Sequence, residues 1–259
     1  MSESFFMQVK SLINLLLYLF KTWITVLPRI VYRCSVSLLI DPKGAQRFIH
    51  HVLSAQDLQV DDSILNSVEL TDLLGDKITD IQIVTSSHKS YSSETRILKE
   101  LMVLGYMMKV IKPRRVFEVG TFIGRTTRLL ALNSPSDCEI FTLDLSKDKV
   151  SHQIGEEYHN TPENRKITQL YGDSREFDFA NWYGKCDFIW VDGCHDVECV
   201  MSDTENALKL RSSKGWIAWH DYRHTAWWSG ITKSVRMTHK SHPNLVHIRG
   251  ITIALLPGK

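Results

Sequence analysis

Apolar runs of strand length alternate with helix-compatible segments along the second half of the chain. The strand-like runs are residues 116–119, 139–143, 167–171, 188–191 and 216–219. The segments with helical spacing between them are residues 126–132, 147–158 and 197–210, with a short helical stretch at 177–182. Strands joined by helix-length crossovers predict a mostly parallel sheet with right-handed connections. Two final apolar runs, 245–249 and 251–256, flank Gly250 and predict a closing antiparallel hairpin.

The residues before the first strand divide into three parts. Residues 92–111 carry apolar side chains with helical spacing up to Pro113, so they predict a helix that opens a sheet domain spanning 92–259. Residues 41–91 predict a helical linker region with loops, including a helix that carries Ile64, Leu65 and Val68. Residues 1–40 predict a separate apolar, amphipathic helical segment.

That N-terminal segment is the most apolar part of the chain. Residues 5–27 hold only two charged side chains, Lys10 and Lys21, and polar residues recur every three or four positions. This spacing places the polar residues on one narrow stripe of a helix. A signal peptide is not indicated, because the start lacks a basic region. Three placements stay open: on a membrane surface, packed in the core or against a subunit of a homo-oligomer, and across a membrane. Lys21 would fall well inside a spanning helix, so the first two fit better.

The composition narrows the classes of partner. At 259 residues the chain has room for one α/β domain of ordinary size plus an appendage. A net charge of only +2 gives no sign of nucleic-acid binding. The five cysteines lack a C-x-x-C arrangement, so neither a disulfide framework nor a structural zinc site is indicated. These features predict a cytoplasmic protein, peripheral at the membrane if residues 5–27 bind its surface.

The turn after the first strand carries the first chemical signal. Glu118 lies near the end of the strand, and Gly120 and Gly124 frame a turn that opens a helix. Glycines let a ligand approach the backbone, and a helix N-terminus offers unpaired N–H groups to an anion. The spacing differs from the G-x-G-x-x-G fingerprint of nicotinamide dinucleotides. It resembles the first motif of class I S-adenosylmethionine-dependent methyltransferases, which implies that these three residues bind S-adenosylmethionine.

Acidic residues also follow the next two strands. Ligands of open α/β sheets bind outside the carboxyl ends of the strands. Asp144 follows the second strand, where a carboxylate can accept hydrogen bonds from both ribose hydroxyls. Asp173, followed by Ser174, resembles the acid that contacts the adenine in the same family. Each aspartate could instead cap a helix, and that alternative stays open.

The fourth and fifth strands end in the most specific pattern. The fourth runs into Asp192 and His195, and the fifth runs into His220 and Asp221. Together these ends resemble the metal-dependent sugar and small-molecule O-methyltransferases, over about residues 92–256. The resemblance implies that Asp192 and Asp221 bind a divalent cation and that His195 is the catalytic base. His220 stands in the first place of an acidic pair and is the third predicted metal ligand.

Methyl transfer to a hydroxyl requires a base, and it is assisted by a bound cation, so histidine and aspartate suit this chemistry. An alcohol is a poor nucleophile, so a base must take its proton while the oxygen attacks the methyl group. Histidine accepts protons near neutral pH, and a divalent cation lowers the pKa of a bound hydroxyl. Imidazole is a softer ligand than carboxylate, so His220 weakens the case for Mg²⁺ against Mn²⁺ or Fe²⁺.

We therefore predict a Rossmann-like class I methyltransferase fold: a mostly parallel seven-stranded sheet ending in an antiparallel hairpin, with an N-terminal helical appendage. The predicted activity is methyl transfer from S-adenosylmethionine to a hydroxyl of a sugar or related small molecule, with Mg²⁺ or Mn²⁺. The apolar N-terminus adds the hypothesis of a lipid-linked acceptor, and Trp227 and Trp228 form either an acceptor floor or a loop anchor. Two alternatives stay open: a non-haem iron oxygenase that uses His195, His220 and an aspartate, and a catalytically silent cofactor-binding module.

Overall fold

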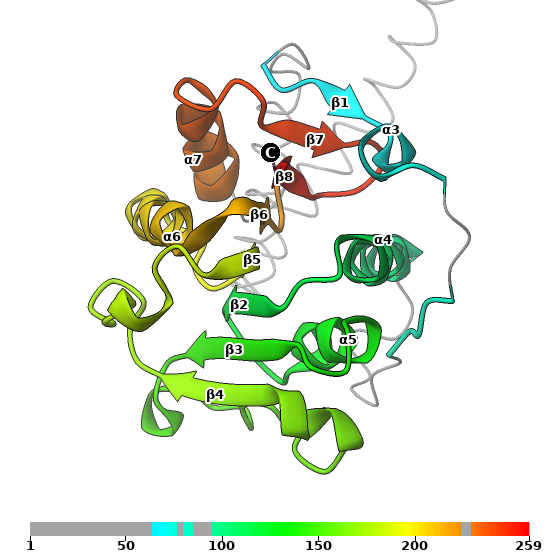
Figure 1. Ribbon diagram of the computed structural model, residues 1–259. Coiled ribbons are helices and arrows are strands. Elements are labelled where there is room, and N and C mark those ends of the chain that lie inside the picture. The colour runs from blue at the N-terminus through cyan, green and yellow to red at the C-terminus, as the bar shows by residue number, and fades with distance from the viewer. Residues whose placement is uncertain (1–63, 77–79, 85–94, 224–228, 259) are drawn as a thin grey trace, which may run out of the picture. The chain divides into compact units, whose positions relative to one another are not determined.

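The computed structural model describes residues 64–76, 80–84, 95–223 and 229–258, all within one compact unit, Val60–Lys259 (Figure 1). Its strands are β1 (Ser67–Val68), β2 (Arg115–Val119), β3 (Glu139–Asp144), β4 (Ile167–Tyr171), β5 (Cys186–Val191), β6 (Arg211–Trp219), β7 (Val246–Ile248) and β8 (Ala254–Leu256). Its α-helices are α3 (Leu70–Leu74), α4 (Thr95–Ile111), α5 (Arg125–Asn133), α6 (Val197–Leu210) and α7 (Ser229–His239). The 3₁₀ helices are η1 (Lys147–Lys149), η2 (Pro162–Lys166) and η3 (Ala180–Trp182).

The strands form one sheet in the order β1-β7-β8-β6-β5-β2-β3-β4. The strands from β4 to β6 pair in parallel, whereas β8 is antiparallel to both β6 and β7. This arrangement confirms the predicted seven-stranded sheet with its closing hairpin. The two-residue strand β1 extends the sheet by pairing in parallel with β7, through Ser67 with His247 and Val68 with Ile248. The helix predicted to carry Val68 is therefore wrong at this residue, because sheet pairing overrides the helical spacing.

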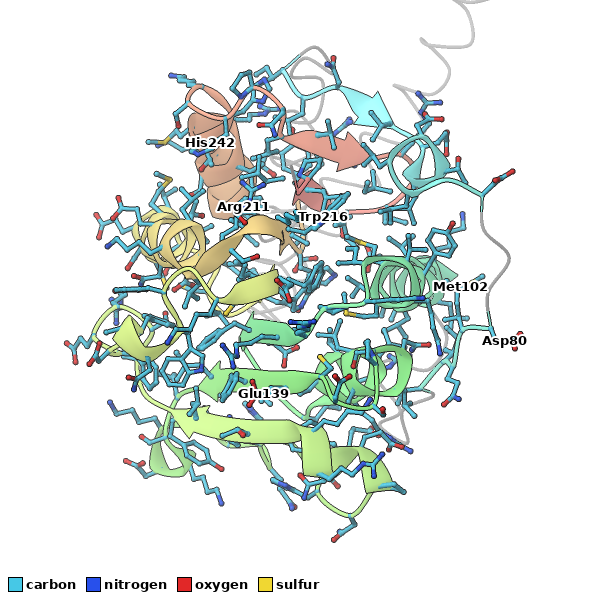
Figure 2. All side chains as sticks on the ribbon, viewed as in Figure 1. Asp80, Met102, Glu139, Arg211, Trp216 and His242 are labelled. Atoms are coloured by element: carbon cyan, nitrogen blue, oxygen red, sulfur yellow. The ribbon has the colours of Figure 1, made fainter. Side chains whose placement is uncertain are left out.

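Helices cover both faces of the sheet. Figure 1 shows α4 and α5 on one face and α6 and α7 on the other. Two apolar cores correspond to these faces. Val116 of β2 belongs to the same core as Leu104 of α4 and Leu130 of α5, and Phe117 of β2 belongs to the same core as Val200 of α6. Successive residues of a strand point to opposite faces, so β2 feeds both cores. Met102 lies on the outer side of α4, where 53% of its surface is exposed (Figure 2).

The crossover after β3 differs from the prediction. Residues 147–158 were expected to form a helix, but only the single turn of η1 is helical there. The rest of the crossover packs on the glycine turn: the N–H groups of Gly155 and Glu157 donate to the carbonyls of Phe122 and Ile123, at 3.0 and 2.9 Å. Gly155 also has a φ of +72°, which an α-helix does not allow. Hydrogen bonds to the glycine turn therefore determine the conformation of residues 147–158.

Several predictions concern residues outside the described part of the chain. These are the amphipathic segment 1–40, residues 41–63 of the linker region, and Trp227 with Trp228. The boundaries of the three predicted parts remain predictions. Among the helices of the described residues, none is long and apolar enough to cross a membrane.

Candidate functional site

The carboxyl ends of five strands meet at one edge of the sheet, and backbone hydrogen bonds hold them in register. The N–H of Asp192 donates to Val119 (2.8 Å), and the N–H of His220 donates to Val191 (3.1 Å). Gly120 donates in the same way to the carbonyl of Leu143, at 2.8 Å. The residues that follow β2, β3, β5 and β6 therefore lie side by side, as the parallel pattern predicted.

Two glycines shape the turn after β2. Gly120 has a φ of +98°, and a Cβ there would overlap the carbonyl oxygen of Asp192. Gly124 is the N-cap of α5 with a φ of +84°, and a Cβ there would lie 2.5 Å from the ring of Tyr158. No side chain caps α5 at Gly124, so its first N–H groups face the turn. Both positions require glycine for its conformation and for the close contact.

Asp144 holds this turn in place. Its Oδ2 accepts hydrogen bonds from the N–H groups of Thr121 (3.0 Å) and Phe122 (2.7 Å), and its Oδ1 accepts from Leu145 (2.7 Å). The carboxylate is partly exposed and lines the cavity described below. Asp144 thus lies where a ribose was predicted to bind, and it also fixes the backbone of the glycine turn.

Glu118 lies beneath the site rather than in it. Its side chain is fully buried, and its Oε2 accepts hydrogen bonds from the hydroxyls of Thr127 (2.5 Å) and Thr142 (2.6 Å). Burial raises the pKa of Glu118 to about 8, although these two hydrogen bonds act in the opposite direction. Its Oε1 has no hydrogen-bond partner among the described residues. The predicted direct contact between Glu118 and a cofactor does not fit this position.

Asp173 and Ser174 follow β4 at the rim of the site. The guanidinium of Arg175 donates to both carboxylate oxygens of Asp173, from Nε at 2.9 Å and from Nη2 at 2.5 Å. These hydrogen bonds, with that of the Arg175 N–H, lower the pKa of Asp173 to about 2. Asp173, Ser174 and Arg175 all line the cavity, so the predicted adenine contacts are next to an arginine that sequence reasoning did not include.

The ends of β5 and β6 bring together Asp192, His195 and Asp221. Within the described residues these three form a group whose potential ligand atoms lie within 4.8 Å of one another. His195 Nε2 is 3.4 Å from Asp221 Oδ2. Two carboxylates and one imidazole are a donor set that suits Mn²⁺ and other divalent transition-metal ions. The donor atoms therefore fit a divalent cation, with His195 as a third ligand or next to the ion.

His220 lies beside this group and faces three carboxylates. Its Nδ1 is 3.1 Å from Asp192 Oδ1 and 3.5 Å from Asp221 Oδ2, and its Nε2 is 3.1 Å from Glu100 Oε2. Burial by itself would lower the pKa of His220, but Asp192, Glu100 and Asp221 together raise it well above the usual value. In this structure both ring nitrogens are in hydrogen bonds, so His220 would have to give up the bond to Asp192 to ligate a metal.

Sequence reasoning missed Glu100 in α4. The signal was present, since Glu100 lies three residues after Ile97 and four before Leu104, on the apolar stripe of the helix. A carboxylate on the core side of a helix needs a partner. Phe122 and His152 were also missed: they line the cavity with ring centroids 4.4 Å apart, and Phe122 has a φ of +50°.

One cavity of about 1150 Å³ joins all these parts. One end is lined by the glycine turn, Asp144 and the residues after β4, and the other by His195, His220 and Asp221. Ile97, Leu101 and Leu104 of α4 add an apolar wall, and Glu100 and Trp190 also line the cavity. The volume is large enough for two small molecules placed end to end.

Comparison with known proteins agrees with this geometry. Residues 117–222 match the model of a family described as a methyltransferase domain. No curated protein sequence matches the chain. The chain is similar to a putative O-methyltransferase from Klebsiella pneumoniae (TM-score 0.51, 17% identity, covering 68% of this chain and 84% of that one). It is also similar to the O-methyltransferase from Bacillus cereus in complex with SAH (TM-score 0.50, 18% identity, covering 86% of this chain and 95% of that one).

The predicted resemblance to class I S-adenosylmethionine-dependent methyltransferases is thus confirmed. At these identities the likeness to solved structures shows the fold, which is the α/β sheet with its terminal antiparallel pair. The matched stretch runs from Phe117 in β2 to Tyr222 after β6 and contains every site residue predicted from the sequence. Glu100 and the hairpin β7–β8 lie outside it.

Proposed function

We propose that this protein transfers a methyl group from S-adenosylmethionine to a hydroxyl of a sugar or related small molecule, with a divalent cation assisting. The observation that carries the proposal is the group Asp192, His195 and Asp221, which lines the same cavity as the glycine turn. The match to a methyltransferase domain supports the cofactor. The cation and the class of acceptor rest on the polar group and on the family resemblance.

The end of the cavity at β2, β3 and β4 would bind the cofactor, which supplies the methyl group. Asp144 would accept hydrogen bonds from the ribose through the lone pairs that its three backbone donors leave available. Gly120 and Gly124 allow the ligand to approach the turn, and the uncapped start of α5 offers N–H groups. Asp173 and Ser174 would lie near the adenine.

The end of the cavity at β5 and β6 would bind the acceptor. His195 takes the proton of the acceptor hydroxyl, while Asp221, at 3.4 Å from its Nε2, fixes the orientation of the ring. A divalent cation held by Asp192 and Asp221 would lower the pKa of that hydroxyl. The apolar side chains of Ile97 and Leu101 nearby suit an acceptor with an apolar part, which agrees with the hypothesis of a lipid-linked sugar.

The first test is calorimetric titration with S-adenosylhomocysteine, with and without Mg²⁺ or Mn²⁺. We expect the wild type to bind and Asp144→Asn to bind more weakly by about tenfold, the effect of losing one charge-assisted hydrogen bond of 1–2 kcal/mol. Asparagine is preferred to alanine, because Asp144→Ala would also remove the acceptor for the N–H groups of Thr121 and Phe122. Thermal unfolding of both proteins without ligand provides the control for stability.

The results of this titration distinguish the proposed methyltransferase from the iron oxygenase and from the silent cofactor-binding module. Absence of S-adenosylhomocysteine binding by the folded wild type would contradict the proposal. Binding of Fe²⁺ in that case would favour the iron oxygenase, for which Asp221 Oδ2 has two histidines nearby, His195 at 3.4 Å and His220 at 3.5 Å. Binding without methyl transfer to any hydroxyl acceptor would favour the silent module.

A further inference from the structure

Glu100 connects three elements at the acceptor end of the cavity. It lies in α4, and only 5% of its side chain is exposed. Its Oε1 accepts two hydrogen bonds from Thr252, one from the hydroxyl (2.6 Å) and one from the N–H (3.1 Å). Its Oε2 lies 3.1 Å from Nε2 of His220. Thr252 belongs to the turn between β7 and β8, and His220 follows β6.

The two carboxylate oxygens of Glu100 therefore bind different partners. Thr252 fixes the position of the carboxylate through Oε1, and Oε2 then determines which way the ring of His220 faces. Because the partner at Nε2 is a carboxylate, this nitrogen must be the donor. The other ring nitrogen, Nδ1, is directed toward Asp192 and Asp221 as a result.

The contacts of His220 support the same arrangement. The Nδ1 atom of its ring lies 3.1 Å from Asp192 Oδ1 and 3.5 Å from Asp221 Oδ2, so the orientation of the ring bears on both carboxylates. Glu100 holds the ring from the opposite side, through Nε2.

We propose that Glu100 is a positioning residue, which acts through His220 to hold Asp192 and Asp221 in place for the divalent cation. The proposal rests on the proposed function for the identity of the site, but the effect on His220 exists without cofactor, cation or acceptor. Partners of this kind behind metal-binding residues change metal affinity by about 10- to 100-fold when they are removed.

The primary test is NMR of the full chain with ¹³C-labelled histidine rings, in the absence of ligands. The His220 signal is assigned from the spectrum of His220→Gln. We expect Glu100→Gln to shift this signal, because a neutral amide replaces the negatively charged carboxylate next to Nε2. Thr252→Val should shift it in the same direction by less, because the N–H of Thr252 still holds Oε1. Lys99→Ala, an exposed neighbour on α4, is the matched control and should leave the signal in place.

Titration with Mn²⁺ is the second readout. We expect Glu100→Gln to weaken Mn²⁺ binding by about 10- to 100-fold and to leave S-adenosylhomocysteine binding unchanged. In the background of His220→Gln the same substitution should have little further effect, since Glu100 acts through that ring.

The results distinguish this proposal from the function it builds on. An unchanged His220 signal in both Glu100→Gln and Thr252→Val would overturn the positioning role, whatever the protein binds. Additive effects of Glu100→Gln and His220→Gln on Mn²⁺ affinity would also overturn it. A wild type that binds no S-adenosylhomocysteine would contradict the proposed function alone, and the NMR comparison would still decide the role of Glu100.

Discussion

Glu118 shows how a single buried carboxyl group ties the stability of the fold to pH. Its pKa in the folded protein, about 8, is above that of an exposed glutamate, because burial disfavours the charged form. The folded state therefore holds this proton when the unfolded chain has already lost it. The resulting stabilisation is complete below the unfolded pKa and is lost as the pH rises through about 8.

We predict that the free energy of unfolding of the wild type falls between about pH 5 and about pH 8 relative to Glu118→Gln, by up to about 1.4 kcal/mol per pH unit. Glutamine keeps an acceptor for Thr127 and Thr142 and cannot ionise. Urea denaturation across this range measures the difference, and Glu156→Gln, an exposed acid, is the matched control. Parallel pH profiles for the wild type and Glu118→Gln would rule out this role.

The sequence predicted which residues meet at the strand ends, but not which way each side chain faces. Apolar runs that end in an acid located Asp144, Asp192 and Asp221 at the edge of the sheet. Glu118 instead lies inside β2, one residue before the strand ends, and pairs there with Thr142. Its carboxylate faces Thr127 of α5 and is fully buried, and this packing of α5 cannot be read from the strand pattern alone.

At the scale of elements, the turns after β2 and β5 are in close contact. We predict that Gly120→Ala strongly lowers the free energy of unfolding, because the new Cβ would overlap the backbone of Asp192. Gly250→Ala is the matched control: it has a similar left-handed φ of +81°, but no atom lies within 4 Å of the new Cβ.

The control should therefore cost only the conformational penalty of about 1–2 kcal/mol. Chemical denaturation of both variants measures the difference. Equal losses for Gly120→Ala and Gly250→Ala would mean that the close contact with Asp192 adds nothing to the conformational effect.

Elements whose conformation follows from their own apolar spacing were predicted correctly. Elements whose conformation depends on contacts with other parts of the chain were not. The range 197–210 predicted for a helix agrees with α6, because its apolar residues face one side of the sheet. The crossover 147–158 has similar spacing but follows the glycine turn, through the hydrogen bonds of Gly155 and Glu157. Glu100 was overlooked for a related reason, because its partners Thr252 and His220 are more than a hundred residues away along the chain.

At the scale of the whole molecule, removal of residues 1–40 tests the function of the apolar segment 5–27. If it binds a membrane surface, removing residues 1–40 should abolish partitioning onto vesicles of phosphatidylcholine and phosphatidylglycerol, because the apolar face of the predicted helix is lost. We expect S-adenosylhomocysteine binding to remain, since the predicted cofactor residues all lie between 118 and 174. Co-sedimentation with vesicles measures the first effect and calorimetry the second. Unchanged partitioning without residues 1–40 would exclude this segment as the membrane contact.

The position of β8 has a consequence for the protein during its synthesis. β8 pairs with β6 on one side and β7 on the other, although it follows both of them in the chain. In the nascent chain, one edge of β6 therefore stays unpaired until β8 has been synthesised. Open strand edges are prone to aggregation. Thr252 is made 152 residues after Glu100, so the carboxylate is synthesised well before the residue that fixes it. The acceptor end of the cavity can take shape only after translation has passed β8.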